Sequence, residues 1–474
     1  MKDIIIIGAG ISGSLIAHAL SKKQVNVTVL EKNNDVANMA SGANSAIIHS
    51  GHDPKSGTLK AKLNVEGNRM YPQLCKELQV DYKPIGAYVV ACGQEEEEKI
   101  EQLKKQCIER NIPYEILTKE QLKNEEPNLS ENITLGLSLP TTGIITPWQV
   151  CIAAMEESIL NGTTLHLNEE VNDIQKEKNK FKVYTKNKIY TADILIDCAG
   201  VYADKVANMI CESQYEITPR RGEYFILDRC EKNYMKHIIY PVPTKKGKGV
   251  LVVPTIHGNI LLGPNAENIQ DKEDTSTTDA LNFVKSQIGK TAENVPFHHI
   301  IHTYAGLRPS GNTKDFVIKE DEKVENFIHV SCIESPGLAS APAIAKMVTE
   351  DILAKHHFET KKQYQNRKKP LVLRDMNVAE KQQAIEENKE CGKIICRCEQ
   401  ISLAEIKDVI HRPCGATTVK GVKRRCRPGM GRCQGGFCEP LIVQILKEEL
   451  KQETILQDEL DSEIQMALAK ENLA

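Results

Sequence analysis

The chain has 474 residues, of which 41% are hydrophobic and 26% are charged. This length exceeds what one hydrophobic core supports, so we expect two or three domains of a soluble globular protein. The formal net charge of −3 gives no general attraction to nucleic acid or anionic membranes. The sequence has no apolar run near the ~20 residues that a membrane-spanning helix needs. We therefore predict a cytoplasmic protein with no nucleic-acid partner, in which any membrane association is peripheral and passes through a partner.

The first 31 residues have the pattern of a dinucleotide-binding unit. The apolar run "DIIIIG" predicts a buried parallel strand, and Gly8, Gly10 and Gly13 follow in G-x-G-x-x-G spacing. These glycines permit a tight turn, backbone approach to a pyrophosphate, and close helix–strand packing. The next helix directs its N-terminal N–H groups toward the phosphates. A second strand, "VNVTVLEK", places Glu31 where its carboxylate accepts hydrogen bonds from ribose hydroxyls.

Later segments return to the same predicted sheet. The loop "ANMASGANSAIIHSGHD" is rich in small polar residues that suit a pyrophosphate and an isoalloxazine. "TADILIDCAGVYADKVA" reads as a strand, a turn at Gly200 and a helix, and "ENFIHVSCIESPGLASAPAIAKMVTEDIL" repeats this pattern at Gly337. A dinucleotide domain built from such distant segments is typical of flavin enzymes. We predict an α/β fold in which residues 1–75, 142–210 and 301–355 form a Rossmann-like domain.

The intervening residues, 76–141 and 211–300, predict an inserted antiparallel sheet that forms the substrate half. Apolar, β-branched runs such as "EYFILD", "GVLVVPT" and "GNILLGP" alternate there with turn signals. The run "QEEEEKIEQLKKQCIERN" predicts a charged helix with a solvated acidic face.

The end of the chain carries a dense group of cysteines. Residues 356–390 are polar and charged, and we expect a linker with a helix or two. Cys396 and Cys398 then form a C-x-C pair, and Cys433 and Cys438 a C-x4-C pair. A reducing cytosol argues against disulfides and favours a metal centre. Two thiolate pairs suit a 2Fe–2S cluster, and structural zinc stays the alternative although C-x-C fits its usual spacings poorly.

The predicted small α-helical module spans residues 391–455, and an acidic helical tail follows over 456–474. Glycines in "GMGRCQGGFC" leave backbone N–H groups free to bond cluster sulfides. The remaining cysteines of the module are interpreted as bystanders: Cys391, Cys414 and Cys426. A basic run either docks an acidic electron-transfer partner or is a solvated or cluster-neutralising face. Its members are Lys420, Lys423, Arg424, Arg425, Arg427 and Arg432.

Together these motifs resemble the D-amino-acid-oxidase-like flavoprotein superfamily. Within it they are most similar to glycerol-3-phosphate oxidases and dehydrogenases, and next to L-2-hydroxyglutarate oxidases. The segments that carry the resemblance are "GAGISG", "SGANSAIIHSGHDPKSGTLKAKLNVEGN", "TPRRGEYFILD", "GKGVLVVPTIHGNILLGPNAE", "AGLRPS" and "ESPGLASAPAIA". The resemblance implies FAD rather than NAD. The residues expected to bind it are Gly8, Gly10, Ser12, Gly13, Glu31, Ser41, Asn44, Ser45, Val171, Gly200, Gly337 and Leu338.

The C-terminal module resembles the bacterioferritin-associated-ferredoxin-like 2Fe–2S domain. The matching cysteines are Cys396, Cys398, Cys433 and Cys438. A cluster beside a flavin implies that electrons leave one at a time. This favours a dehydrogenase that delivers to an acceptor protein or a quinone-linked subunit over an oxidase that forms peroxide.

Oxidation of an alcohol also needs a group that takes the hydroxyl proton, and histidine suits this task at neutral pH. The resemblance favours His49 over His52 and Asp53, although an isolated histidine is more often structural. For the substrate anion it implies Arg308, whose guanidinium forms paired hydrogen bonds with carboxylate or phosphate. Lys248 is a further candidate for phosphate and for catalysis, with a solvated loop lysine as the plain alternative.

Ser335 is a candidate hydrogen-bond donor to the substrate from the loop before the last helix, whereas Arg220 and Arg221 read as structural. The resemblance thus implies oxidation of sn-glycerol 3-phosphate to dihydroxyacetone phosphate, with hydride transfer to the flavin. The alternatives are oxidation of a 2-hydroxy acid such as L-2-hydroxyglutarate, and a flavoprotein subunit that relays electrons.

Overall fold

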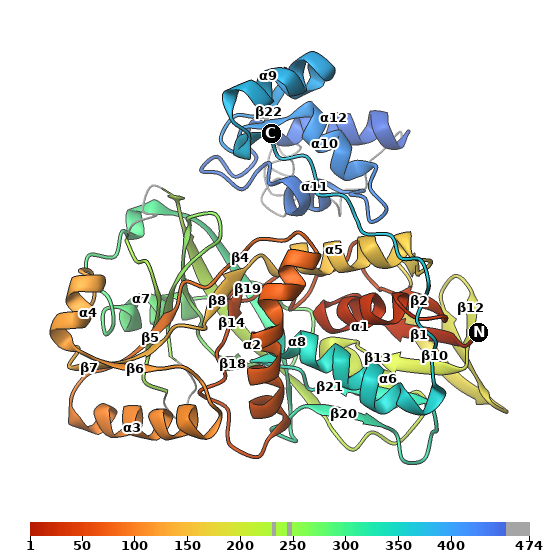
Figure 1. The fold of residues 1–474 in the computed structure, drawn as a ribbon, viewed down its shortest axis with the longest axis horizontal. Helices are drawn as coiled ribbons and strands as arrows, with labels where there is room; N and C mark the ends of the chain where they lie inside the picture. Colours follow the sequence, from red (N-terminus) through yellow and green to blue (C-terminus); the bar gives the residue numbers. More distant parts are fainter. Residues whose placement is uncertain (230–233, 244–248, 452–474) are drawn as a thin grey trace. The chain divides into compact units, whose positions relative to one another are not determined.

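The computed structural model describes residues 1–229, 234–243 and 249–451. The chain divides into two compact units, Met1–Tyr364 and Gln365–Ala474, which we describe separately (Figure 1). Lys248 and the predicted tail, 456–474, lie outside the described residues.

The first sheet of the larger unit contains the predicted dinucleotide unit. Its strand order is β20-β21-β13-β1-β2-β9, with neighbours parallel except for β20, which runs antiparallel to β21. The strands are β1 (Asp3–Ile7), β2 (Asn26–Leu30), β9 (Thr164–His166), β13 (Ile194–Asp197), β20 (Val317–Glu320) and β21 (Phe327–Ser331). Helix α1 (Ile11–Ser21) joins β1 to β2. The predicted strand–turn–helix–strand unit is therefore confirmed.

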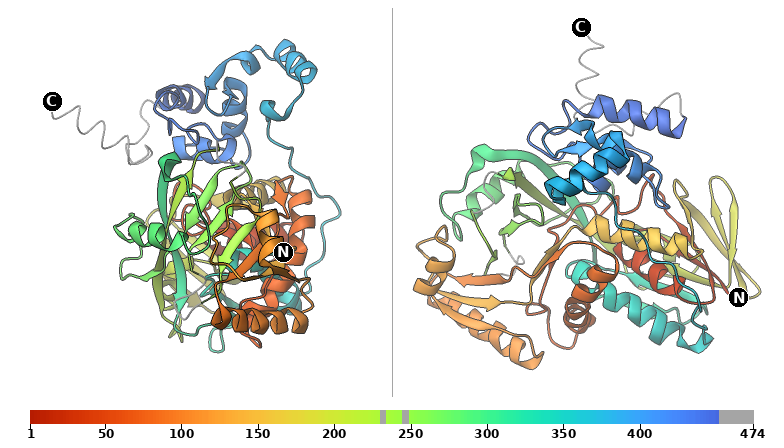
Figure 2. Two further views of the ribbon diagram at one scale, coloured as in Figure 1. Left: turned by 90° about the vertical axis from the view of Figure 1, so that its left-hand side faces the viewer. Right: turned by 45° about the horizontal axis from the view of Figure 1, so that its top comes forward.

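Packing layers cover both faces of this sheet. Helix α1 lies beside α5 (Pro147–Leu160) and α8 (Gly337–Lys346) (Figures 1 and 2). On the other face, Ile5 and Ile7 pack against a small sheet and helix α6 (Ala203–Ala207). The small sheet comprises β10 (Val171–Glu177), β11 (Lys180–Thr185) and β12 (Ile189–Ala192). Successive strand residues point to opposite faces, so the continuous isoleucine run of β1 serves both layers.

Helix α2 (Leu59–Glu77) packs against α8. A Cβ at Gly67 would lie 2.1 Å from the Ala339 carbonyl oxygen, so glycine permits this close approach. Helix α8 continues into the π-helical turn Met347–Ile352 and the 3-10 turn Leu353–His356. A further small sheet has the order β3-β8-β4, with β3 (Ile47–Ile48), β4 (Tyr82–Lys83) and β8 (Gly143–Ile145).

The inserted segments form a second large sheet in the order β18-β14-β17-β16-β15-β5-β7-β6, with β19 paired to β14. The strands are β5 (Ala87–Ala91), β6 (Glu115–Thr118), β7 (Leu135–Leu139), β14 (Ile217–Leu227), β15 (Ile238–Pro241), β16 (Leu251–Pro254), β17 (Ile260–Gly263), β18 (Glu267–Asn268) and β19 (Ile300–Gly311). Helices α3 (Gln94–Glu109), α4 (Lys119–Glu125) and α7 (Ala280–Ile288) accompany it, with the 3-10 turns Gly200–Tyr202 and Phe297–His299 elsewhere in the unit.

Two details differ from the predicted antiparallel insert. Strand β15 runs parallel to β5, because the chain leaves for the dinucleotide sheet between them and returns in the same direction. The sheet is therefore mixed. In addition, β19 pairs with β14 along nearly its whole length, so residues 300–311 lie in this sheet although most of them were assigned to the Rossmann-like domain.

The smaller unit is built mainly from short helices. Its elements are α9 (Val378–Glu387), β22 (Ile394–Cys396), β23 (Ile401–Ser402), α10 (Leu403–Ile410), α11 (Val419–Cys426) and α12 (Glu439–Leu450), with 3-10 turns at Leu373–Asp375 and Lys389–Gly392. The unit boundary divides the predicted linker, residues 356–390. Leu373 packs with Cys391 and Ala404, and its N–H donates to Glu405 Oε1 at 3.1 Å, so this part of the segment packs into the smaller unit.

Candidate cofactor and substrate sites

The turn between β1 and α1 requires glycine. Gly8 has φ +100°, and a Cβ there would lie 2.5 Å from the Cys198 carbonyl oxygen. A Cβ at Gly13 would lie 2.0 Å from the Gly8 carbonyl oxygen. Left-handed φ values favour glycine, and both close contacts are with rigid backbone. The turn therefore presents bare backbone at the N terminus of α1, as a pyrophosphate site needs.

Glu31 closes the same turn from the end of β2. Its side chain is 7% exposed, with Oε2 accepting from the Ala9 N–H at 2.8 Å and Oε1 from the Asn33 N–H at 2.9 Å. Burial raises the pKa of Glu31, and these hydrogen bonds oppose that rise. Each carboxylate oxygen has two lone pairs, so the group keeps acceptor capacity for ribose hydroxyls. The donors and acceptors of this turn fit a dinucleotide.

The loop after β2 bridges the two large sheets. The Ile11 N–H donates to Ser41 Oγ at 2.8 Å, which ties the loop to the first turn of α1. Tyr304 on β19 donates from its hydroxyl to the Asn44 carbonyl at 2.7 Å. A Cβ at Gly306 would lie 1.9 Å from the Ala43 carbonyl oxygen. The loop is thus held between the N terminus of α1 and strand β19 of the second large sheet.

The other predicted cofactor residues differ in their position and burial. Gly200 begins a turn directly after β13 with φ +59°, beside the first glycine turn. The carbonyl of Leu338, at the start of α8, accepts from the Tyr71 hydroxyl at 2.6 Å. Val171 packs in the hydrophobic core between the first sheet and the small sheet. Ser12 is buried in α1, and Ser45 is half-buried in the bridging loop.

His49 is buried directly after β3. Its Nδ1 lies 2.9 Å from the hydroxyl of Tyr240, at the third position of β15, and its carbonyl accepts from Asn64 at 2.6 Å. The ring of His52 also contacts Tyr240, with centroids 5.9 Å apart. Burial raises the pKa of Tyr240 well above its ordinary value, so the phenol stays neutral. Tyr240 is not predicted as a site residue from the sequence, because a tyrosine in an apolar strand is usually a core residue.

Arg308 lies on β19, directly opposite Arg220 on β14. Its Nη2 donates to the Asn265 carbonyl at 3.2 Å, and a Cβ at Gly222 would lie 2.1 Å from this nitrogen. The guanidinium therefore passes over a glycine, and the Asn265 carbonyl holds one of its ends. Ser335 is exposed and is joined by a cis peptide bond to Pro336, the N-cap residue of α8.

The Arg221 side chain forms ion pairs on the opposite face of β14. It contacts Asp274 at 2.7 Å, Glu267 at 2.8 Å and Glu223 at 3.4 Å. These ion pairs account for Arg221 as a structural residue of the sheet, which agrees with its interpretation from the sequence.

The four predicted ligand cysteines converge in the smaller unit, each pair joining one early and one late cysteine. Cys398 Sγ lies 3.4 Å from Cys433 Sγ. A hydrogen bond with the Cys438 thiol lowers the pKa of Cys396 to about 6 and raises that of Cys438. A Cβ at Gly431 would lie 2.5 Å from Cys398 Cβ, so the chain passes closely there. Four thiols with glycine backbone beside them fit a 2Fe–2S cluster.

The other cysteines of this unit make different contacts. Arg425 donates from Nη2 to Cys414 Sγ at 3.7 Å, and Cys426 Sγ donates to the Val422 carbonyl at 3.5 Å. Cys391 packs with Leu373. These contacts support their interpretation as bystanders.

The basic run is partly internal. Arg424, Arg425 and Arg427 are 6%, 7% and 7% exposed, and Arg427 Nε donates to Glu399 Oε2 at 3.1 Å. These three arginines therefore form neither a solvated face nor a docking surface, whereas their interpretation as cluster-neutralising residues stays a prediction. Only Lys420 and Arg432 are exposed among the six basic residues of the run.

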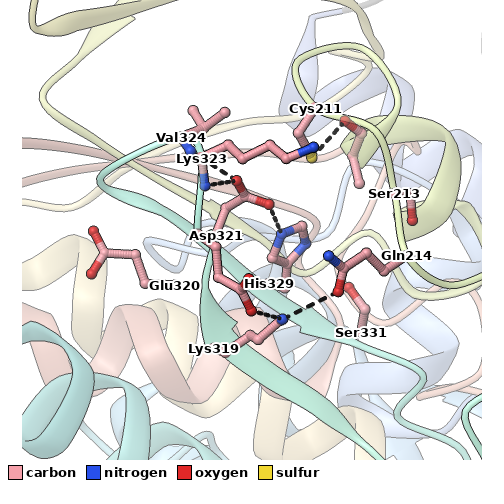
Figure 3. Close-up of polar contacts among 12 residues, drawn as sticks. Cys211, Ser213, Gln214, Lys319, Glu320, Asp321, Lys323, Val324, His329 and Ser331 are labelled. Atoms are coloured by element: carbon pink, nitrogen blue, oxygen red, sulfur yellow. Dashed lines mark hydrogen bonds and ion pairs between the residues drawn. The ribbon is translucent and has the colours of Figure 1, made fainter.

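Another polar cluster lies at the edge of the first sheet (Figure 3). Ligand-type atoms of Cys211, Asp321 and His329 lie within 4.8 Å of one another. Nε2 of His329 lies 3.1 Å from Asp321 Oδ2, and Nδ1 lies 3.0 Å from the Tyr215 hydroxyl. Asp321 Oδ1 accepts two N–H groups of the following turn. These hydrogen bonds explain the cluster as a brace between β20 and β21, without a metal.

Two family matches cover most of the chain. Residues 3–351 match the family described as FAD dependent oxidoreductase, and residues 394–448 match the BFD-like [2Fe-2S] binding domain. In the described residues, no helix is both long and apolar enough to cross a membrane.

Individual proteins are similar over long stretches. The chain is 44% identical to a glycerol 3-phosphate dehydrogenase of Caloramator mitchellensis, covering 95% of both chains. It is 28% identical to human mitochondrial L-2-hydroxyglutarate dehydrogenase, covering 74% of this chain and 88% of that one. Among solved structures, dithionite-reduced L-alpha-glycerophosphate oxidase from Mycoplasma pneumoniae with FAD bound has a TM-score of 0.74 at 30% identity, covering 77% of this chain and 98% of that one.

Proposed function

Because the chain belongs to the FAD-dependent oxidoreductase family and carries a 2Fe–2S domain, we propose that it oxidises sn-glycerol 3-phosphate to dihydroxyacetone phosphate. The observation that carries this proposal is the 44% identity with a glycerol 3-phosphate dehydrogenase over 95% of both chains. The arrangement of His49 and Arg308 supports the same substrate class.

The two large sheets have different roles in this proposal. The first sheet, with the glycine turn, Glu31 and the bridging loop, holds FAD, and the mixed sheet forms the substrate side. When bound, FAD supplies the acceptor for the hydrogen on C2 of the substrate. The bridging loop sets the spacing between these parts, because it is tied both to α1 and to β19.

His49 removes the proton of the C2 hydroxyl. In the proposed tautomer the Tyr240 oxygen accepts a hydrogen bond from Nδ1–H, and Nε2 is the nitrogen that takes the substrate proton. Burial of both rings excludes water from this pair. A positioned base contributes about 10²–10⁴-fold to such a reaction.

Arg308 binds the phosphate of the substrate. Nη2 of its guanidinium donates a hydrogen bond to the Asn265 carbonyl. Because the guanidinium is planar and rigid, this hydrogen bond also fixes the direction of the remaining N–H groups. Lys248 and Ser335 are further proposed contacts, and Lys248 lies outside the described residues.

The four cysteines hold the 2Fe–2S cluster, which when bound accepts electrons singly. We assign the electron exit to this module, with a protein or quinone-linked acceptor. The relationship with L-2-hydroxyglutarate dehydrogenase makes oxidation of a 2-hydroxy acid the second candidate.

The test is an anaerobic reaction of the holoenzyme followed through the visible flavin absorbance. Bleaching with sn-glycerol 3-phosphate, but with neither glycerol nor L-2-hydroxyglutarate, is the expected result. Bleaching with L-2-hydroxyglutarate alone supports the second candidate instead. A flavin that reacts with none of them leaves an electron-relay subunit and overturns the proposal.

A further inference from the structure

We propose that Asn64 and Asn68 of helix α2 are positioning residues for the reaction, because their amide groups fix the backbone of His49. The inference rests on the proposed function, in which His49 removes the substrate proton. It goes beyond that function by assigning the placement of His49 to two side chains of a different element. Neither asparagine is selected by any sequence motif.

Both amide groups converge on one carbonyl group. Nδ2 of Asn64 donates to the His49 carbonyl oxygen at 2.6 Å, and Nδ2 of Asn68 donates to the same oxygen at 3.2 Å. A carbonyl oxygen has two lone pairs and accepts from two donors. Asn68 also donates to the Thr141 carbonyl at 2.9 Å, in the turn before β8. The backbone of His49 is therefore held by two amides, one of which is itself tied to a neighbouring turn.

The residue type at these two positions needs an explanation. Asn64 and Asn68 are one helical turn apart and share a face of α2, where they are 0% and 6% exposed. Asparagine has a low helix propensity, and a buried amide is destabilising unless it is hydrogen-bonded. Leucine would suit a buried helical position better. The hydrogen bonds to the His49 carbonyl therefore account for both asparagines.

The same helix also contacts the helix that carries two predicted FAD contacts. A Cβ at Gly67 would lie 2.1 Å from the Ala339 carbonyl oxygen, and the Tyr71 hydroxyl donates to the Leu338 carbonyl at 2.6 Å. Gly337 and Leu338 begin α8. Helix α2 thus joins the His49 backbone to the start of α8, and it fixes the spacing between the proposed base and this part of the proposed cofactor site.

His49 is consequently held at both ends. The two asparagines fix its carbonyl, and the hydroxyl of Tyr240 lies 2.9 Å from Nδ1 of its ring. A base has to lie within hydrogen-bond reach of the proton that it removes, and a misplacement of about 1 Å costs about 10²-fold in rate. Loss of an asparagine should therefore slow flavin reduction, whereas substrate binding through Arg308 should change little.

The test follows anaerobic flavin reduction of the full-length holoenzyme by sn-glycerol 3-phosphate in a stopped-flow instrument. Asn64→Leu is expected to lower the limiting rate about 5- to 50-fold and to change the substrate Kd less than about threefold. Asn259→Leu is the matched control, because Asn259 is 8% exposed and its amide donates to the Leu227 carbonyl at 2.9 Å, within the second large sheet. The control should lower the melting temperature without changing the limiting rate.

The same substitution in a His49→Ala background separates positioning from a general structural loss. If Asn64 acts through His49, Asn64→Leu should lower the residual rate of this background less than about twofold. An equal factor in both backgrounds overturns the inference, as does an unchanged limiting rate in the single variant. Flavin absorbance verifies folding, and Asn64→Ser replaces the leucine variant if that variant does not retain FAD.

A failure of the proposed function gives a different result. If L-2-hydroxyglutarate reduces the wild-type flavin and sn-glycerol 3-phosphate does not, the proposed substrate is wrong, and the same comparison with L-2-hydroxyglutarate decides the inference. A His49→Ala variant that reduces its flavin at the wild-type rate overturns both the role of His49 and the inference. Reduction of the wild-type flavin by neither compound also overturns both.

Discussion

Nδ1 of His49 lies 2.9 Å from the hydroxyl of Tyr240, although 191 residues separate the two in the chain. Their ring centroids are 5.8 Å apart with planes tilted by 43°. The contact couples the end of β3, beside the bridging loop that follows β2, to β15 in the second large sheet. A neutral phenol at this position orients the imidazole, and in the proposed function it determines which nitrogen faces the substrate.

We expect Tyr240→Phe to lower the rate of flavin reduction by about 3- to 30-fold, because the imidazole loses one hydrogen bond worth roughly 0.5–1.5 kcal/mol and its orientation. The KM for substrate should change little. Stopped-flow measurement of the rate against pH checks this, since loss of the phenol should also shift the acidic limb of the profile. An unaltered rate and profile would show that the contact is only structural.

Replacement of the proposed base should be far more severe. His49→Ala is expected to lower flavin reduction by about 10²–10⁴-fold. His52→Ala is the matched control, because His52 contacts the same tyrosine ring and is also buried. Similar rate losses in the two variants would contradict a specific role for His49 as the base.

Cys433→Ser should separate the two redox centres. We expect the variant to lose iron and acid-labile sulfide, to reduce its flavin at the wild-type rate, and to deliver electrons more slowly to a one-electron acceptor. Cys414→Ser is the control, since that thiol contacts Arg425 rather than the four converging cysteines. Retention of a full cluster by Cys433→Ser would exclude this cysteine as a ligand.

Asp197 predicts a pH dependence of stability. Burial raises the pKa of this carboxyl to about 8. A hydrogen bond from the Ala199 N–H, at 3.0 Å, opposes this rise. Between its ordinary pKa near ~4 and pH 8 the folded state binds more protons than the unfolded state, so the free energy of unfolding falls as pH rises.

Asp197→Asn keeps the shape and the hydrogen-bond acceptor but cannot ionise. The decline in the melting temperature of the holoprotein between pH 5 and pH 8 should therefore become shallower in this variant. Melting curves that decline equally in both proteins would show that Asp197 is already charged when folded.

Gly306→Ala should disturb the bridging loop after β2, since the new Cβ would lie 1.9 Å from the Ala43 carbonyl oxygen. We expect weaker FAD retention, measured as the fraction of flavin lost on dialysis against moderate salt, together with a melting temperature several degrees lower. Gly289→Ala is the matched control, because a Cβ there meets no atom within 4 Å and φ is −60°. Equal FAD retention in both variants would contradict the role of this close approach.

Local patterns determined the beginning of the fold. The isoleucine strand, the glycine turn, helix α1 and Glu31 all lie within 31 residues, and their geometry follows from short-range propensity and periodicity. The cysteine spacing indicated a metal site locally, but the fold brings Cys398 beside Cys433 and Cys396 beside Cys438, so the closest thiols come from different local pairs. The sequence by itself therefore indicated both cofactor sites and their residues.

Tertiary structure alone decided which distant residues meet. The pairing of Arg220 with Arg308 depends on the register of β14 and β19, and a shift of one residue would have moved Arg221 onto that face instead. The contact between His49 and Tyr240 depends on the packing of two sheets. Burial of Arg425 and Arg427 depends on partners, Cys414 and Glu399, that the charge pattern does not reveal. Long-range register and burial are properties of the packed chain, and no local window of sequence contains them.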